Sequence, residues 1–156
     1  MGKYAADTQV SSEQSRAEIE RTLRRYGATS FAYGWESNRA LVAFEMQSRR
    51  IRFILPMPDP RAPEFTLTPT RQLPRSEAEA RRAYEQAVRQ RWRALALVIK
   101  AKLEAVDAGI AVFEEEFLAH IVLPNDATVG QFMLPQIGAA YTTGRMPPML
   151  PMPTDD

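Results

Sequence analysis

The chain has 156 residues, of which 45% are hydrophobic and 25% charged, and its net charge is +1. This length and composition predict one domain with a core of its own. The absence of cysteine excludes disulfides, thiolate metal sites and cysteine nucleophiles, and it is typical of a reducing compartment, so we expect a cytoplasmic protein. The first residues contain no apolar leader segment, and no run of about 18 apolar residues occurs, so we expect neither secretion nor membrane insertion.

A first helix is predicted over residues 12–26. Ser11 and Gln14 have the spacing of a capping box, in which each side chain bonds the backbone N–H of the other residue. Apolar residues then recur at helical spacing up to Gly27, a residue that commonly ends helices. These apolar positions are Ile19, Leu23 and Tyr26.

Three strands are predicted next, over residues 29–35, 40–47 and 50–55, with short polar links between them. Strands joined by such short links form an antiparallel meander. Alternate residues of a strand face opposite sides of the sheet. One face of the last two strands is therefore apolar, with Val42, Phe44, Met46, Ile51, Phe53 and Leu55, whereas Arg50 and Arg52 lie on the other.

A proline-rich loop follows, because residues 56–74 hold six of the twelve prolines and proline removes a backbone donor. The segment 65–68 inside it, FTLT, is a candidate edge strand. Ser76 and Glu79 form a second capping box, and the helix that they open is predicted to run to about Val106.

Two shorter helices complete the prediction. One carries Ile110, Phe113, Phe117 and Ile121 and ends before Pro124, and the other begins after Thr128 and runs to about Tyr141, with Pro135 inside it. Residues 146–156 form a tail rich in proline and methionine. The sequence thus predicts a single α+β domain over residues 1–145: an N-terminal helix, a three-stranded antiparallel sheet, a long basic helix and two shorter C-terminal helices.

Charge is distributed unevenly along the chain. Residues 71–103 contain nine basic and three acidic residues, and residues 104–156 contain one basic and eight acidic residues. Arginine provides 17 of the 20 basic side chains, and its planar guanidinium binds phosphates and carboxylates through paired hydrogen bonds. This pattern predicts either a polyanion-binding face or two segments that neutralise each other within the molecule.

The long predicted helix has two opposed faces. Arg82, Arg89, Arg93 and Lys100 lie within about 20° of one another around its axis and form a basic stripe. A basic stripe of this length is able to follow a nucleic-acid backbone. The alternative is a solvated outer face, with Glu114, Glu115 and Glu116 as partners. The opposite face is an apolar seam formed by Tyr84, Val88, Trp92, Leu95, Ile99, Leu103 and Val106.

The first predicted strand places Phe31, Tyr33 and Trp35 on one side of the sheet. Exposed aromatic rings beside arginines stack on bases in single-strand-binding proteins. Tyr33 and Trp35 are therefore candidate nucleic-acid contacts, and the arginines beside them are Arg49, Arg50 and Arg52. Burial of the rings under a helix that crosses the sheet is the alternative.

No catalytic, metal-binding or cofactor signature occurs in the sequence. His120 lies one helical turn after Glu116, but two ligands do not define a metal site, and the glycine-rich phosphate loops and the nucleophile elbow are absent. We therefore expect a protein that is not an enzyme and needs no cofactor. A hydrolase with an unrecognised carboxylate site is a further alternative.

Two stretches, SSEQSRAEIERTLRRYGATSFAYGW at residues 11–35 and EEEFLAHIVLPNDATVGQFMLPQI at residues 114–137, resemble small uncharacterised proteins encoded by bacteriophages and prophages. The resemblance implies an accessory role in handling DNA or blocking a host protein. The sequence thus leads to two hypotheses. The first is nucleic-acid binding through the basic stripe, and the second is a protein-interaction module, either an oligomer or an inhibitor of a host protein, that uses the apolar seam and the methionine-proline tail.

Overall fold

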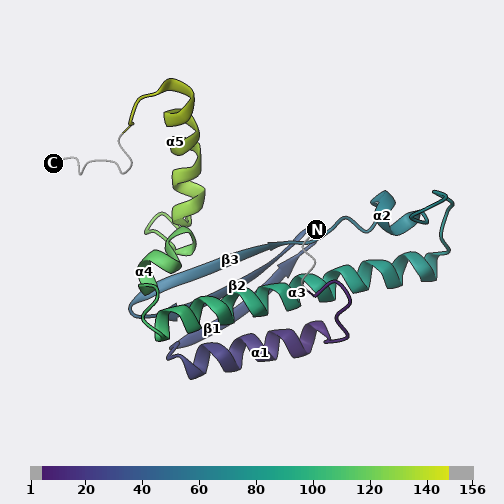
Figure 1. Ribbon diagram of the computed structural model, residues 1–156, viewed down its shortest axis with the longest axis horizontal. Coiled ribbons are helices and arrows are strands. Elements are labelled where there is room, and N and C mark those ends of the chain that lie inside the picture. Colours follow the sequence, from purple (N-terminus) through teal and green to yellow (C-terminus); the bar gives the residue numbers. More distant parts are fainter. Residues whose placement is uncertain (1–4, 148–156) are drawn as a thin grey trace.

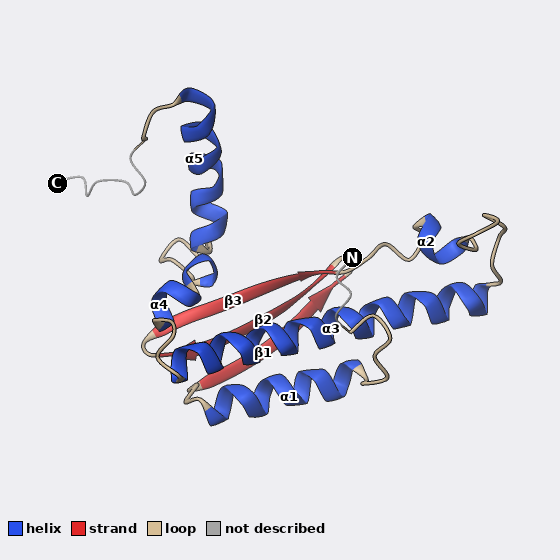
Figure 2. Ribbon diagram, viewed as in Figure 1, coloured by secondary structure: helices blue, strands red, loops and turns tan. Residues whose placement is uncertain are grey.

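The computed structural model describes residues 5–147 and has the α+β architecture that the sequence predicts (Figures 1 and 2). The prediction of an N-terminal helix, a three-stranded sheet, a long helix and shorter C-terminal helices is confirmed. The main elements are α1 (Ser12–Arg25), β1 (Ser30–Glu36), β2 (Arg39–Met46), β3 (Arg49–Pro56) and α3 (Glu77–Asp107). The shorter ones are α2 (Pro63–Thr66), α4 (Phe113–Glu116), the 3₁₀ turn η1 (Leu118–His120) and α5 (Val129–Thr143).

The sheet is antiparallel with the strand order β1-β2-β3. Tyr33 pairs with Val42, and Val42 pairs with Phe53, so these three side chains lie on the same face. The second hairpin turns at Gln47 and Ser48, which both have positive φ angles of 50° and 61°. Two such residues form the tight turn that suits the twist of a hairpin.

Within residues 5–147, capping boxes begin all three helices longer than one turn, as the sequence predicts. Ser11 and Gln14 bond reciprocally at α1, Ser76 and Glu79 at α3, and Thr128 and Gln131 at α5. Each box satisfies two backbone N–H groups that would otherwise lack partners at a helix start. The local sequence therefore determines where these helices begin.

The core lies between the sheet and the pair α1 and α3, which run side by side across one sheet face (Figure 1). Val42 and Phe44 of β2 pack in one buried cluster with Ile19 of α1 and with Trp92 and Ile99 of α3. The predicted apolar seam of α3 is buried from Trp92 to Leu103, and Val106 is partly buried. Burial of this seam at about 25 cal/mol per Å² of apolar surface is the main force that holds the two layers together.

The proline-rich segment contains a helical turn, and the expected edge strand at 65–68 is wrong. Phe65 lies in α2, is buried, and packs edge to face against Tyr84 of α3 with ring centroids 5.6 Å apart. Pro63 takes the first position of α2, where the missing N–H of proline costs nothing. The N-terminal part of α3 is thus covered by the segment that precedes it.

The predicted helix around residues 110–121 is instead divided into α4 and η1. Phe113 and Phe117 are both buried, and Phe117 contacts Phe44 and Phe53 edge to face at 6.0 and 6.2 Å. The chain then leaves helical geometry, since Val122 donates to the carbonyl of Arg50 and so lies along the outer edge of β3. α5 follows and projects away from the sheet and from α3 (Figure 1). Most of the predicted tail, residues 148–156, lies outside the described residues.

Candidate functional site

The predicted basic stripe of α3 is interrupted in its middle. The Arg93 guanidinium forms an ion pair with Glu18 of α1, and Arg89 donates two hydrogen bonds to Gln86 Oε1, at 3.1 and 2.6 Å. Gln86 in turn bonds the backbone carbonyls of Ala6 and Thr8 at 3.2 and 3.0 Å. The two central arginines thus tie α3 to α1 and to the N-terminal segment.

The ends of the stripe, Arg82 and Lys100, are exposed and have no ion-pair partner among residues 5–147. They are 18 positions apart, which corresponds to about 27 Å along the helix axis. Two free cations at that separation do not form a continuous stripe.

Lys100 lies beside two further cations that the sequence prediction did not include. A hollow of about 310 Å³ between α1 and α3 is lined by Arg21, Arg25 and Lys100, together with Glu18, Thr22 and Tyr26. The three basic side chains are exposed and form no ion pair within the described part of the chain. Glu18 is already paired with Arg93. We call Arg21, Arg25 and Lys100 the basic cluster.

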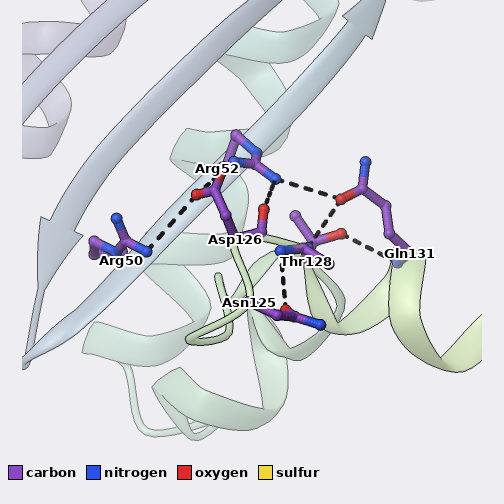
Figure 3. Close-up of polar contacts among 7 residues, drawn as sticks. Arg50, Arg52, Asn125, Asp126, Thr128 and Gln131 are labelled. Carbon is purple, nitrogen blue, oxygen red and sulfur yellow. Dashed lines mark hydrogen bonds and ion pairs between the residues drawn. The ribbon is translucent and has the colours of Figure 1, made fainter.

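The three predicted arginines of β3 all have acidic partners from the C-terminal third of the chain, and Figure 3 shows those of Arg50 and Arg52. Arg49 approaches Glu114 at 3.1 Å, and Arg50 approaches Asp126 at 3.9 Å. Arg52 contacts the Asp126 carboxylate at 3.4 Å and donates to its backbone carbonyl at 2.6 Å. The acidic C-terminal third thus neutralises the arginines of β3. The basic stripe of α3 instead has its acidic partner, Glu18, on α1.

The aromatic side chains of β1 lie on the face that the helices cover, at its margin. Tyr33 is half-exposed and packs edge to face against Trp92 at 6.3 Å, and the Arg16 guanidinium lies 4.9 Å from its ring centroid. Trp35, in contrast, is 79% exposed. Tyr33 is engaged within the fold, and Trp35 is available to a partner.

α5 is an uncharged helix, and no residue of it is buried within the described structure. It has an apolar stripe, because Met133, Leu134, Ile137, Ala140 and Tyr141 fall within about 120° of one another around the axis. Leu134 is 65% exposed and Tyr141 is 88% exposed. We call these five residues the α5 seam.

Only the first turn of α5 is fastened to the body. Gly130 lies so close to η1 that a Cβ atom there would be 3.0 Å from the Ala119 carbonyl oxygen. Arg52 also reaches Gln131 Oε1 at 3.4 Å (Figure 3). These contacts set the direction in which the rest of the helix leaves the body.

The sheet face opposite α1 and α3 carries a second apolar surface. Its middle is formed by two cross-strand rows of side chains, and charged residues stand at both ends, with the ion pair of Glu36 and Arg39 at one of them. Two hollows, of about 180 and 460 Å³, indent this face on either side of Arg52. We call the middle the open sheet face and define it by Ala32, Gly34, Leu41, Ala43 and Ile54.

His120 is the one histidine of the chain and lies flat against Phe53, with ring centroids 4.0 Å apart. Burial, together with the nearby Lys102 ammonium, lowers the pKa of His120 below its ordinary value, and a hydrogen bond to the backbone of Arg52 acts in the opposite direction. Lys102 is itself paired with Glu116 at 2.9 Å. Among the described residues, no group of three histidine or carboxylate side chains is arranged to hold a metal ion.

Comparison with models of known protein families, with curated protein sequences and with solved structures finds no match for this chain. Within the described residues, no helix has both the length and the apolar character needed to cross a membrane.

The exposed apolar helix is the feature that sequence reasoning missed. The predicted boundaries of α5 are close to the observed ones, but no role was assigned to it. A signal was present, because residues 127–144 form a run of 18 residues without a charged side chain. Surface helices of globular proteins normally carry charges on the outer face, so an uncharged helix indicates burial somewhere.

Proposed function

We propose that the protein is a non-enzymatic protein-interaction module that docks through α5. The observation that carries the proposal is the projection of an uncharged helix whose apolar seam contacts little of its own molecule. A contiguous exposed apolar surface on a folded domain is typical of a partner-binding site.

The helical state of α5 is only marginally stable without a partner. Helices of about 15 residues are marginal in water without tertiary packing, and α5 contains Pro135 and Gly138, which cost roughly 3 and 1 kcal/mol relative to alanine in a helix interior. Only the first turn packs on the body. Burial of the α5 seam in a groove supplies the missing stabilisation, in the manner of an amphipathic helix bound by a receptor.

Thiol labelling tests this proposal, because the natural chain has no cysteine and a single introduced one reacts alone. Leu134→Cys lies in the α5 seam, and Thr142→Cys lies on the opposite side of the same helix and is its matched control. In extracts of the producing cell we expect labelling at position 134 to be at least about tenfold slower than at position 142, as burial predicts. Equal labelling rates at positions 134 and 142, both in concentrated protein and in extract, would refute docking through α5.

The basic cluster supports a second candidate function, the binding of nucleic acid. Arg21, Arg25 and Lys100 converge on one hollow from two helices, and none of them forms an ion pair within the described residues. Three unpaired cations attract a phosphate backbone, with an affinity that decreases as salt rises. Arg82 and Trp35 are exposed on the same molecule, whereas the other predicted contacts, Arg49, Arg50, Arg52, Arg89, Arg93 and Tyr33, already have partners within it.

Fluorescence anisotropy with single-stranded and double-stranded DNA and RNA at two salt concentrations tests this candidate. The double variant Arg21→Glu/Arg25→Glu is expected to weaken binding by at least about tenfold, since each reversal replaces a phosphate contact with repulsion. Arg61→Glu/Arg71→Glu is the control, because it changes the net charge equally at exposed positions in the proline-rich segment. Equal losses in both variants, or no binding at low salt, would rule out the basic cluster as a nucleic-acid site.

A further inference from the structure

The open sheet face has no helix over it in the described structure, although its centre is apolar (Figure 2). Leu41, Ala43 and Ile54 are only partly covered, and Ala32 is exposed. Two-layer domains with one sheet normally have a polar outer face. The central rows here, which pair Ala32 with Ala43 and Gly34 with Leu41, contain no charged residue on β1 or β2.

Arg52 is the one charged side chain in these rows, and it is held at the margin. Asp126 and Gln131 bind its guanidinium at the β3 side of the face, between the two hollows (Figure 3). The middle of the face therefore stays free of charge. Alanine and glycine at its centre also allow a helix to approach closely, since nothing lies within 4 Å of the position that a Gly34 side chain would take.

The α5 seam and the open sheet face are similar in extent. Met133 and Tyr141, at the two ends of the seam, are eight positions apart, which corresponds to about 12 Å along the helix axis. The open sheet face consists of two rows of side chains and extends about 10 Å across the three strands, so the helix fits it when it lies across the strands. The α5 seam carries no charge, and Arg52, the one charged side chain of the two central rows, is already paired with Asp126, so contact confined to these rows desolvates no unpaired ion.

α5 leaves its own molecule in a direction away from the sheet (Figure 1). We infer that the α5 seam of one copy docks on the open sheet face of a second copy, with the helix lying over the Ala32–Ala43 and Gly34–Leu41 pairs. The inference rests on the proposed function, and it adds the identity of the partner. Because donor and acceptor are different surfaces, the contact forms a reciprocal pair, a closed ring or an open chain of copies.

Sedimentation velocity and native mass spectrometry on two single variants of the full chain test the inference. Leu134→Lys places a charge in the donor seam, and Ala32→Lys places one in the acceptor face, at an exposed position that the fold tolerates. Each is expected to weaken self-association by at least about tenfold. Thr142→Lys and Ser37→Lys, both at exposed positions outside the two surfaces, are the matched controls and are expected to associate like the wild type.

The decisive step is to mix the two impaired variants. The Ala32→Lys protein still has an intact α5 seam, and the Leu134→Lys protein still has an intact open sheet face, so their mixture is expected to form a 1:1 complex that neither forms alone. A wild-type chain that stays monomeric at all concentrations overturns the inference, and so does an Ala32→Lys variant that associates normally while Leu134→Lys does not. In the latter case docking through α5 stands. If Leu134→Lys associates normally as well, the inference fails, and the labelling of Leu134→Cys and Thr142→Cys in extract then decides the proposed function.

Discussion

His120 makes the stability of the fold depend on pH. Its pKa is lowered in the folded protein, first by burial against Phe53 and then by Lys102, so the unfolded chain binds a proton more readily than the folded one. The contribution of neutral His120 to the free energy of unfolding is therefore complete above about pH 6.5, the ordinary pKa of histidine. This contribution is lost as the pH falls through the lowered pKa of the folded protein.

We expect the free energy of unfolding of the wild type to decrease between about pH 7.5 and 5.5 more than that of His120→Gln, which has no proton to gain. Urea denaturation of both proteins at the two pH values measures the difference. Parallel decreases in both would show that His120 titrates normally in the folded state.

Ser15 is the second residue whose environment predicts an unusual result. Its hydroxyl is buried on the inner face of α1 and has no hydrogen-bond partner. Among the described residues it is the one buried side-chain oxygen or nitrogen without such a partner. A buried polar group without a partner costs about 1–3 kcal/mol. Ser15→Ala should therefore leave the free energy of unfolding unchanged or raise it by about 1 kcal/mol in chemical denaturation, whereas a loss of that size would mean that the hydroxyl has a partner.

At the scale of elements, α5 depends on the close approach of Gly130 to the Ala119 carbonyl oxygen. Gly130→Val would force the first turn of α5 off η1, at a cost of about 1–3 kcal/mol. We expect limited proteolysis within residues 131–143 to become faster in this variant. Gly138→Ala is the control on the same helix, because space is open around that position and alanine favours a helix by up to about 1 kcal/mol. Faster cleavage in both variants would show that the change in cleavage rate does not come from loss of the contact between Gly130 and η1.

The elements themselves could largely be predicted from the sequence, because their determinants are local. Ser11, Ser76 and Thr128 each begin a helix through a partner three residues away, and the alternation of β2 identifies its buried face. The helix predicted before Pro124 is divided into α4 and η1, because packing of Phe117 between Phe44 and Phe53 overrides helical periodicity there.

The candidate sites could be predicted only in part, because they depend on pairs far apart in the chain. Arg93 and Glu18 are 75 residues apart, and Arg52 and Asp126 are 74 apart. Nothing in the local sequence distinguishes Arg93, which is paired, from Lys100, which is not. The exposure of α5 could not be predicted either, since an apolar helix has the same sequence pattern whether its own domain or a partner covers it.

At the scale of the whole molecule, part of the uneven charge of the sequence is neutralised internally. Acidic residues of the C-terminal third pair with β3 and with Lys102, and the free cations that remain are concentrated on α1, on the proline-rich segment and at the ends of the α3 stripe. Two apolar surfaces that the rest of the molecule does not cover, the α5 seam and the open sheet face, are then the main candidate surfaces for contact with a protein partner.

Hydrogen exchange of the α5 amides as a function of protein concentration tests the central claim most directly, with α1 as the internal reference. An unpacked helix of this length opens readily, so the α5 amides should exchange rapidly in dilute protein. As the concentration rises and the α5 seam becomes covered, we expect their exchange to slow by at least about tenfold while that of α1 stays constant. Exchange in α5 that is equally fast at every concentration, or equally slow at every concentration, would contradict the account.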